Sequence, residues 1–129
     1  MNISLIVEDE ALLCDVYQKI LKDLGNTGQI DFFETNVATN CHEALTFIEK
    51  CVEYKRNINF SILDYRMGGP ENTKMTTGLS IGLKLKSFFP QCKILMITSL
   101  TNGYVLHSIL KRLKPDGFLI KSDIDLPNL

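Results

Sequence analysis

The segment FSILDYRM (Phe60–Met67) passes from a short apolar run into an acid. Phe60, Ile62 and Leu63 are typical of the end of a buried strand, and Asp64 follows Leu63 with nothing polar between them. Carboxylates are seldom placed at the boundary of a core unless another group satisfies them. Asp64 is therefore the first residue whose presence needs an explanation.

Strands and helices are predicted to alternate along the rest of the chain. Short apolar runs predict strands over residues 3–7, 33–38, 58–63, 93–97 and 118–120. Apolar residues at helical spacing predict helices over 11–24 (with Gly25 as the stop), 41–54, 79–88, and a fourth that begins after Asn102. Asn40 and Glu43 have the spacing of a capping box. This alternation predicts an α/β fold, a doubly wound parallel sheet with helices on both faces.

The composition is that of one ordinary globular domain. The 129 residues are 45% hydrophobic and 22% charged, with a net charge of −1. No basic face is evident that would bind nucleic acid. No apolar run is long enough to suggest a membrane span or an export signal. The four cysteines form no metal-binding or redox motif, which favours reduced thiols in a cytoplasmic protein.

Polar residues directly follow four of the predicted strands. In a parallel sheet with right-handed crossovers, the carboxyl ends of all strands meet at one edge, where such folds bind ligands. We therefore expect these side chains to lie close together. They are Glu8, Asp9 and Glu10 after the first strand, Asp64 after the third, Thr98 and Ser99 after the fourth, and Lys121 after the fifth.

This set of groups is suited to moving a phosphoryl group. Carboxylates crowded at one edge raise one another's pKa unless a cation is present, and a few carboxylates with waters are the ligands that Mg²⁺ prefers. Lys121 can offer positive charge to phosphoryl oxygens and Thr98 a hydroxyl donor. A carboxylate such as Asp64 can itself be the nucleophile and form an acyl phosphate.

The chain resembles the receiver domain of two-component response regulators over essentially its whole length. The resemblance is carried by LIVEDE (5–10), ILDYRM (62–67), MITS (96–99) and GFLIK (117–121), in the order and spacing of that family. It implies a flavodoxin-like five-stranded sheet of order 2-1-3-4-5, with residues 1–129 as one receiver domain. It also implies a regulatory phosphoprotein rather than an enzyme.

The resemblance assigns roles to individual residues. Asp64 would be the phosphoacceptor. Lys121 would pair with the phosphoryl oxygens, Thr98 would be the switch hydroxyl, and Phe118 would swing inward with it. Mg²⁺, for which Mn²⁺ could substitute, would be held by a set of oxygen ligands: Glu8, Asp9, Asp64 and the backbone carbonyl of Arg66.

The sequence departs from the usual family pattern at several positions. Glu8 stands where aspartate is commoner, Ser122 replaces the proline that usually follows the lysine, and Phe118 lacks the hydroxyl of a tyrosine. The connection over 67–77 is longer than usual, and SDIDLPNL (122–129) ends where a fifth helix would begin. We expect the sequence to be the N-terminal part of a longer regulator, although the helix could be replaced or supplied by a second chain.

Other functions remain open at this point. A phosphatase of the haloacid dehalogenase type also uses an aspartyl nucleophile, but places a DxD motif after an early strand. A flavodoxin-like cofactor binder would need a Ser/Thr/Gly-rich loop after Val7, and a receiver that docks without phosphorylation would not need Asp64, Thr98 and Lys121. The expected partner is a sensor histidine kinase or phosphotransfer protein, with a homodimer also open, and with neither nucleic acid nor membrane bound by this domain.

Overall fold

The computed structural model describes residues 2–28, 33–65, 78–98 and 103–121. Strands and helices alternate through them as predicted. In chain order the elements are β1 (Asn2–Val7), α1 (Ala11–Asn26), β2 (Phe33–Ala38), α2 (Cys41–Glu53), β3 (Ile58–Asp64), α3 (Gly78–Phe88), β4 (Lys93–Thr98), α4 (Gly103–Leu113) and β5 (Gly117–Ile120).

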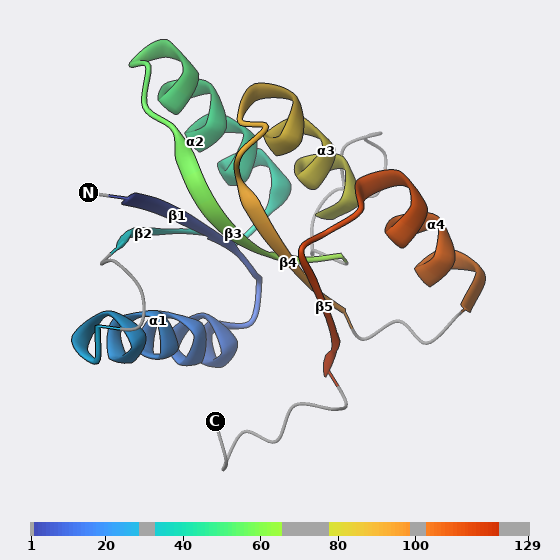
Figure 1. The fold of residues 1–129 in the computed structure, drawn as a ribbon, viewed down its shortest axis with the longest axis horizontal. Helices are drawn as coiled ribbons and strands as arrows, with labels where there is room; N and C mark the ends of the chain where they lie inside the picture. Colours follow the sequence, from blue (N-terminus) through green and yellow to red (C-terminus); the bar gives the residue numbers. More distant parts are fainter. Residues whose placement is uncertain (1, 29–32, 66–77, 99–102, 122–129) are drawn as a thin grey trace.

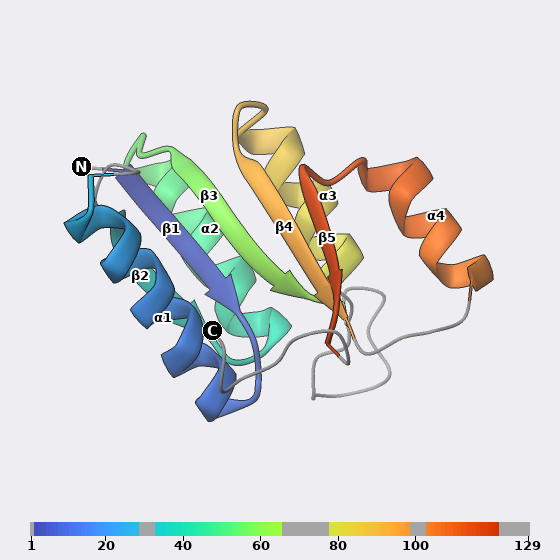
Figure 2. The same cartoon turned by 60° about the horizontal axis from the view of Figure 1, so that its bottom comes forward.

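The strands form one parallel sheet in the order β2-β1-β3-β4-β5. This confirms the predicted fold class and strand order. β1 is paired on both sides, and its Val7 lies opposite Leu63 of β3. On the other side of β3, Asp64 lies opposite Ile97 of β4. The carboxyl ends of β1, β3 and β4 therefore reach the same edge of the sheet (Figure 2).

Helices cover both faces of the sheet (Figure 1). α1 lies on one face, where Leu13, Tyr17 and Leu21 pack with Ile62 and Ile97. α2, α3 and α4 cover the other face, over the larger hydrophobic cluster. Parallel strands that are covered on both faces have nearly continuous apolar sequences, because side chains on both sides are buried. This is why the sequence pattern identifies them clearly.

The N-terminus of α2 shows how local sequence sets a helix boundary. The side chain of Asn40 accepts a hydrogen bond from the Glu43 N–H at 2.8 Å, as the capping box predicts. The returning bond is shifted by one residue, because Glu43 Oε1 accepts from the Thr39 N–H at 2.7 Å and from the Thr39 hydroxyl at 2.8 Å. Both exchanges hold the chain at the turn between β2 and α2.

Three details of the predicted elements are wrong. α1 does not stop at Gly25, which is buried inside the helix; the chain leaves the helix after Asn26 and reaches a positive φ of 76° at Gly28. β3 and β4 each extend one residue further than predicted, because their ladder continues through Asp64 and Thr98. The apolar spacing of the predicted helix 41–54 also places Val52 on its buried side with Ala44 and Ile48, but Val52 is 39% exposed.

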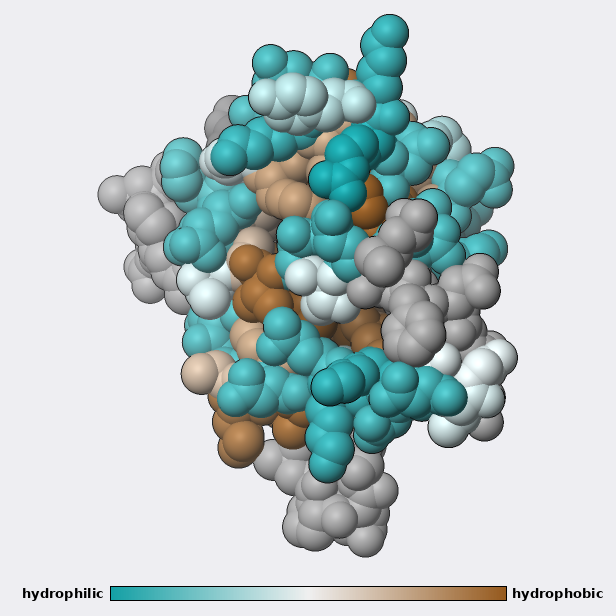
Figure 3. All heavy atoms as spheres, turned by 90° about the vertical axis from the view of Figure 1, so that its left-hand side faces the viewer, coloured by the Kyte–Doolittle hydropathy of each residue, from teal (hydrophilic) through white to brown (hydrophobic). Residues whose placement is uncertain are grey.

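Other expectations lie outside the described residues: those for Arg66, the long connection 67–77, Ser99, the cap at Asn102 and the segment after Lys121. Among the residues that the structure does describe, no helix is long and apolar enough to cross a membrane. The four cysteines are free thiols. Seen from the side of α1, α2 and the β2 edge, the surface is mostly hydrophilic, with hydrophobic residues showing between the polar ones (Figure 3).

Candidate functional site

Side-chain alternation along the strands brings the predicted site together. Ile6 and Ile62 face α1 and belong to its hydrophobic cluster. Because side chains two apart on a strand share a face, Glu8 and Asp64 point to that same side, one step beyond the covered core. The Glu8 N–H still donates to the Ala38 carbonyl at 3.0 Å, which continues the β1–β2 ladder and fixes the backbone of Glu8.

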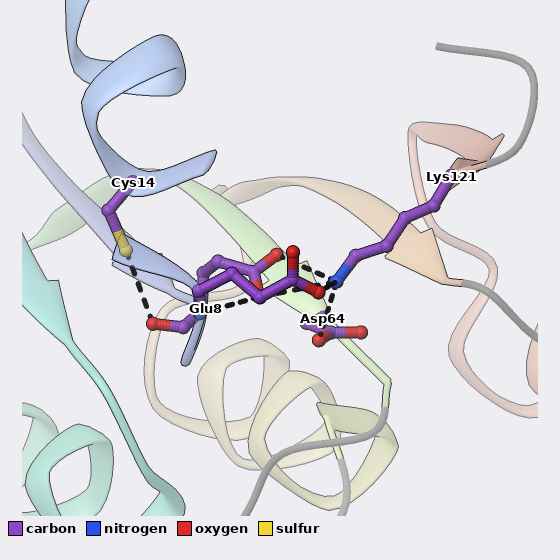
Figure 4. Close-up of polar contacts among 5 residues, drawn as sticks. Glu8, Cys14, Asp64 and Lys121 are labelled. Atoms are coloured by element: carbon purple, nitrogen blue, oxygen red, sulfur yellow. Dashed lines mark hydrogen bonds and ion pairs between the residues drawn. The ribbon is translucent and has the colours of Figure 1, made fainter. Parts of the chain in front are cut away.

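Lys121 sits at the centre of this edge and donates to three carboxylates. Its Nζ lies 3.1 Å from Asp64 Oδ2, 3.2 Å from Glu8 Oε2 and 3.1 Å from Glu10 Oε1. Figure 4 shows the lysine reaching from the end of β5 across to Glu8 and Asp64. The side chains of Glu8 and Asp64 are 1% and 4% exposed, whereas that of Glu10 is 60% exposed. Two of the three ion pairs are therefore shielded from water.

The charges of the site perturb one another. Burial raises the pKa of Glu8 to about 7, and the negative charge of Asp64 adds to this effect, although hydrogen bonds from the Glu10 N–H and from Lys121 act in the opposite direction. Burial alone would lower the pKa of Lys121, but its hydrogen bonds to Glu10 and Asp64 outweigh that effect and raise it. Among the described residues at this edge, the carboxylates of Glu8, Glu10 and Asp64 share the single ammonium of Lys121.

A divalent cation fits this arrangement. Glu8 Oε1 is buried and lies 3.2 Å from Lys121 Nζ, yet it accepts no hydrogen bond from any described residue. Carboxylate oxygens of Glu8, Asp9 and Glu10 lie within 4.8 Å of one another. An oxygen-only donor set with excess negative charge selects a hard cation of the Mg²⁺ or Ca²⁺ kind.

The two predicted switch residues lie on the other side of the sheet. Thr98 is fully buried at the end of β4, opposite Ile120 of β5. Phe118 lies opposite Met96 and is partly buried against the larger core cluster. Strand alternation therefore puts Thr98 and Phe118 on the face that α2, α3 and α4 cover, with Thr98 at the same edge as Asp64.

The sequence did not predict two participants in the site, and it predicted the position of a third without its partner. Glu10 was expected at this edge as one of three acids, and its carboxylate binds Lys121. The Cys14 thiol donates to the Glu8 carbonyl at 3.2 Å and so anchors α1 to the site (Figure 4). The buried Tyr17 hydroxyl has no hydrogen bond with any described residue, and burial together with the negative charge of Glu8 raises its pKa. Only Glu10, which continues the acidic run, had a signal in the sequence.

Gly78 is a third feature of the site without an obvious sequence signal. Its N–H donates to the Tyr65 carbonyl at 2.7 Å, just past the end of β3. A Cβ at this position would lie 2.1 Å from the carbonyl oxygen of Asp64 and 3.0 Å from the Cα of Tyr65. The first turn of α3 therefore packs directly on the backbone of Asp64, at a distance that only glycine allows.

The raised pKa of Glu8 predicts a dependence of stability on pH in the metal-free protein. An unfolded glutamate loses its proton near 4.5, whereas folded Glu8 keeps it up to about pH 7. The contribution of Glu8 protonation to the unfolding free energy is therefore fully present below pH 4.5. This contribution is lost as the pH rises to about 7. A shift of this size corresponds to on the order of 3 kcal/mol of unfolding free energy.

Chemical denaturation of the wild type and Glu8→Gln between pH 4.5 and 8, with chelator present, tests this expectation. The glutamine variant cannot titrate at this position and should lack the pH-dependent stability that Glu8 contributes. The difference in unfolding free energy between the two proteins should therefore change with pH. A constant difference over the whole range would contradict the assignment.

Solved structures of response regulators match this architecture. The receiver domain protein (CheY-like) from Methanospirillum hungatei has a TM-score of 0.70 at 19% identity, covering 99% of this chain and 86% of that one. A response regulator from Burkholderia pseudomallei has a TM-score of 0.65 at 20% identity, covering 99% and 64%. NtrX from Brucella abortus has a TM-score of 0.70 at 24% identity, covering 99% and 25%. No protein-family model matches the sequence, and no curated protein sequence does.

The chain thus has the fold of response-regulator receiver domains over its full length. It spans about two thirds or less of the Burkholderia and Brucella proteins, at 64% and 25% of their lengths. The Burkholderia structure contains a phosphorylated aspartic acid and a calcium ion.

Proposed function

We propose that this chain is a receiver domain that accepts a phosphoryl group on Asp64 in a Mg²⁺-dependent reaction and changes conformation in response. The observation that carries the proposal is the carboxylate of Asp64, which is 4% exposed and held 3.1 Å from the Lys121 ammonium at the ligand-binding edge of a receiver fold. The acids of Glu8 and Asp9 beside it complete a set suited to phosphoryl transfer.

In the proposed reaction, an oxygen of Asp64 attacks the phosphorus of a phosphohistidine or of a small acyl phosphate. The new P–O bond forms as the bond from phosphorus to the leaving nitrogen or oxygen breaks, and the leaving group keeps the electron pair. Lys121 pairs with a phosphoryl oxygen and offsets the added negative charge. The short, nearly buried Asp64 side chain keeps the nucleophile in one orientation, which lowers the entropy lost on reaching the transition state.

Mg²⁺, or Mn²⁺ in its place, would be held by Glu8, Asp9, Asp64 and the backbone carbonyl of Arg66. When bound, it supplies the positive charge that the carboxylates and an incoming phosphoryl group require. Glu8 Oε1 supports this assignment, because it is buried and pairs with the Lys121 ammonium at 3.2 Å but accepts no hydrogen bond from any described residue.

Thr98 and Phe118 are proposed to transmit the change. The Thr98 hydroxyl would donate to the phosphoryl group, and Phe118 would move inward as Thr98 leaves its resting position. Their placement on one face supports this pairing, since Phe118 lies beside Met96, the residue two before Thr98 on β4. The movement would reach the surface through α4, which covers the same face.

As a receiver, residues 1–129 would act in regulation rather than in metabolic catalysis. The proposed phosphodonor is a sensor histidine kinase or phosphotransfer protein in the cytoplasm, and the proposed target is an output domain or partner. Among the similar structures, RcsB from Salmonella enterica is bound to a promoter. In such a regulator the DNA contact would belong to another domain, because no basic face is evident in this sequence.

Incubation with acetyl phosphate and Mg²⁺, followed by intact-mass measurement, tests the function. We expect one phosphoryl adduct with Mg²⁺ or Mn²⁺ and none after chelation by EDTA. No adduct on the folded protein with either metal would overturn the proposal. Sustained turnover of p-nitrophenyl phosphate without an adduct would instead indicate a phosphatase.

A further inference from the structure

Glu10 lies at the start of α1, at a position where Ser, Thr, Asp or Asn usually caps a helix. It is the N-cap residue of α1, with extended backbone angles of φ −90° and ψ 113°, yet its side chain makes no capping hydrogen bond. Instead the carboxylate reaches across the edge of the sheet to Lys121, 111 positions later in the chain, at 3.1 Å. The N–H of Glu10 meanwhile donates to Glu8 Oε2 at 3.2 Å.

The ammonium of Lys121 has no donor left for a phosphoryl oxygen. A lysine ammonium carries three N–H groups, and the described part of the chain supplies three acceptors, one each from Glu8, Glu10 and Asp64. A new bond from Lys121 to a phosphoryl group therefore requires the release of one existing acceptor.

Burial decides which acceptor can be released. The carboxylates of Glu8 and Asp64 are 1% and 4% exposed, so breaking either ion pair would leave a buried carboxylate without the ammonium that balances its charge. The carboxylate of Glu10 is 60% exposed and can exchange Lys121 for water at little cost. The bond between Glu10 and Lys121 is therefore the one that exchanges.

We propose that Glu10 is a positioning residue that holds Lys121 in the unphosphorylated protein and must release it before the ammonium pairs with a phosphoryl oxygen. This inference rests on the proposed function. Glu10 also places a further negative charge beside the incoming phosphoryl group. It thereby slows the phosphorylation of Asp64 and competes for Lys121 afterwards, which shortens the life of the acyl phosphate.

Phosphorylation kinetics with acetyl phosphate at saturating Mg²⁺ test the proposal. Glu10→Gln should be phosphorylated about two- to fivefold faster than the wild type, the range that loss of one exposed ion pair can produce. Its acyl phosphate should decay more slowly, and raising the salt concentration should reduce its advantage over the wild type. Because Glu10 is exposed, the variant is expected to fold normally.

Two further variants separate position from charge. Asp15→Asn removes one negative charge from an exposed position on the same helix and should leave the rate unchanged. Glu10→Asp keeps the charge but shortens the side chain, so it should behave like Glu10→Gln if reach to Lys121 is what matters. Equal rates for the wild type and Glu10→Gln, or an equal gain in Asp15→Asn, would overturn the proposal.

A metal-free measurement keeps this test independent of phosphorylation. NMR spectra recorded with chelator present should show faster exchange of the Lys121 ammonium protons with water in Glu10→Gln than in the wild type, and no change in Asp15→Asn. If the wild type takes no phosphoryl group, the proposed function fails whatever this measurement shows. If the wild type is phosphorylated and Glu10→Gln only needs more Mg²⁺, Glu10 is a metal ligand and the positioning role is wrong.

Discussion

Asp64→Asn is expected to take up no phosphoryl group from acetyl phosphate at saturating Mg²⁺. The amide oxygen is a poor nucleophile and carries no charge to share with a cation. The fold should survive, because asparagine has the same shape and its oxygen can still accept a hydrogen bond from Lys121. Intact-mass measurement against the wild type is the readout, with circular dichroism to show that the variant is folded.

Asp23→Asn is the matched control for this experiment. Asp23 lies on the exposed side of α1, and the change removes the same charge by the same chemistry. It should be labelled as fully as the wild type. An adduct on Asp64→Asn equal to that of the control would place the phosphorylation on another residue.

Gly78→Ala is expected to have the largest effect of any change outside the charged cluster. The new methyl group would lie 2.1 Å from the Asp64 carbonyl oxygen and 2.8 Å from its carbonyl carbon, so either α3 or the end of β3 must move. Overpacking against backbone should lower the unfolding free energy by about 2 kcal/mol. A shift of the nucleophile should also slow phosphorylation at least about tenfold.

Gly82→Ala is the comparison for this prediction, one turn later on the same helix. There the methyl group would meet the ends of the Leu113 and Leu63 side chains, at 2.8 Å and 3.2 Å, which can move aside. The higher helix propensity of alanine offsets part of the strain. Urea denaturation and phosphorylation rates should be measured on both variants. Equal losses of unfolding free energy and of phosphorylation rate in the two variants would refute the special role of Gly78.

Most of the fold could be predicted because apolar runs report burial on both faces of a parallel sheet. The same signal misplaced the strand ends, since a polar residue was taken to end each strand. Asp64 and Thr98 are buried within the ladder, where backbone pairing continues regardless of the side chain. Gly25 was misread for a similar reason: a glycine can end a helix, but it can also be packed inside one.

The candidate site was less predictable than the fold. Strand order and side-chain alternation suffice to bring Glu8, Asp64 and Lys121 together, because each follows from the position of a strand end. The role of Glu10 depends on the direction of a long side chain at a helix start, and that of Gly78 on the distance between two backbones. The sequence shows neither quantity, although the acidic run does place Glu10 near the site.

The hydrogen bonds of Lys121 also determine the stage of folding at which the site can form. The lysine is separated from Glu8 by 113 positions and from Asp64 by 57. Closing loops of this length is entropically unfavourable, and a protein is synthesised from its N-terminus. A growing chain therefore contains Asp64 and the acids of β1 well before it has the ammonium that balances their charge. Under the proposed function, phosphorylation would become possible only when β5 joins the sheet, so a half-made or partly unfolded molecule would not react with a phosphodonor.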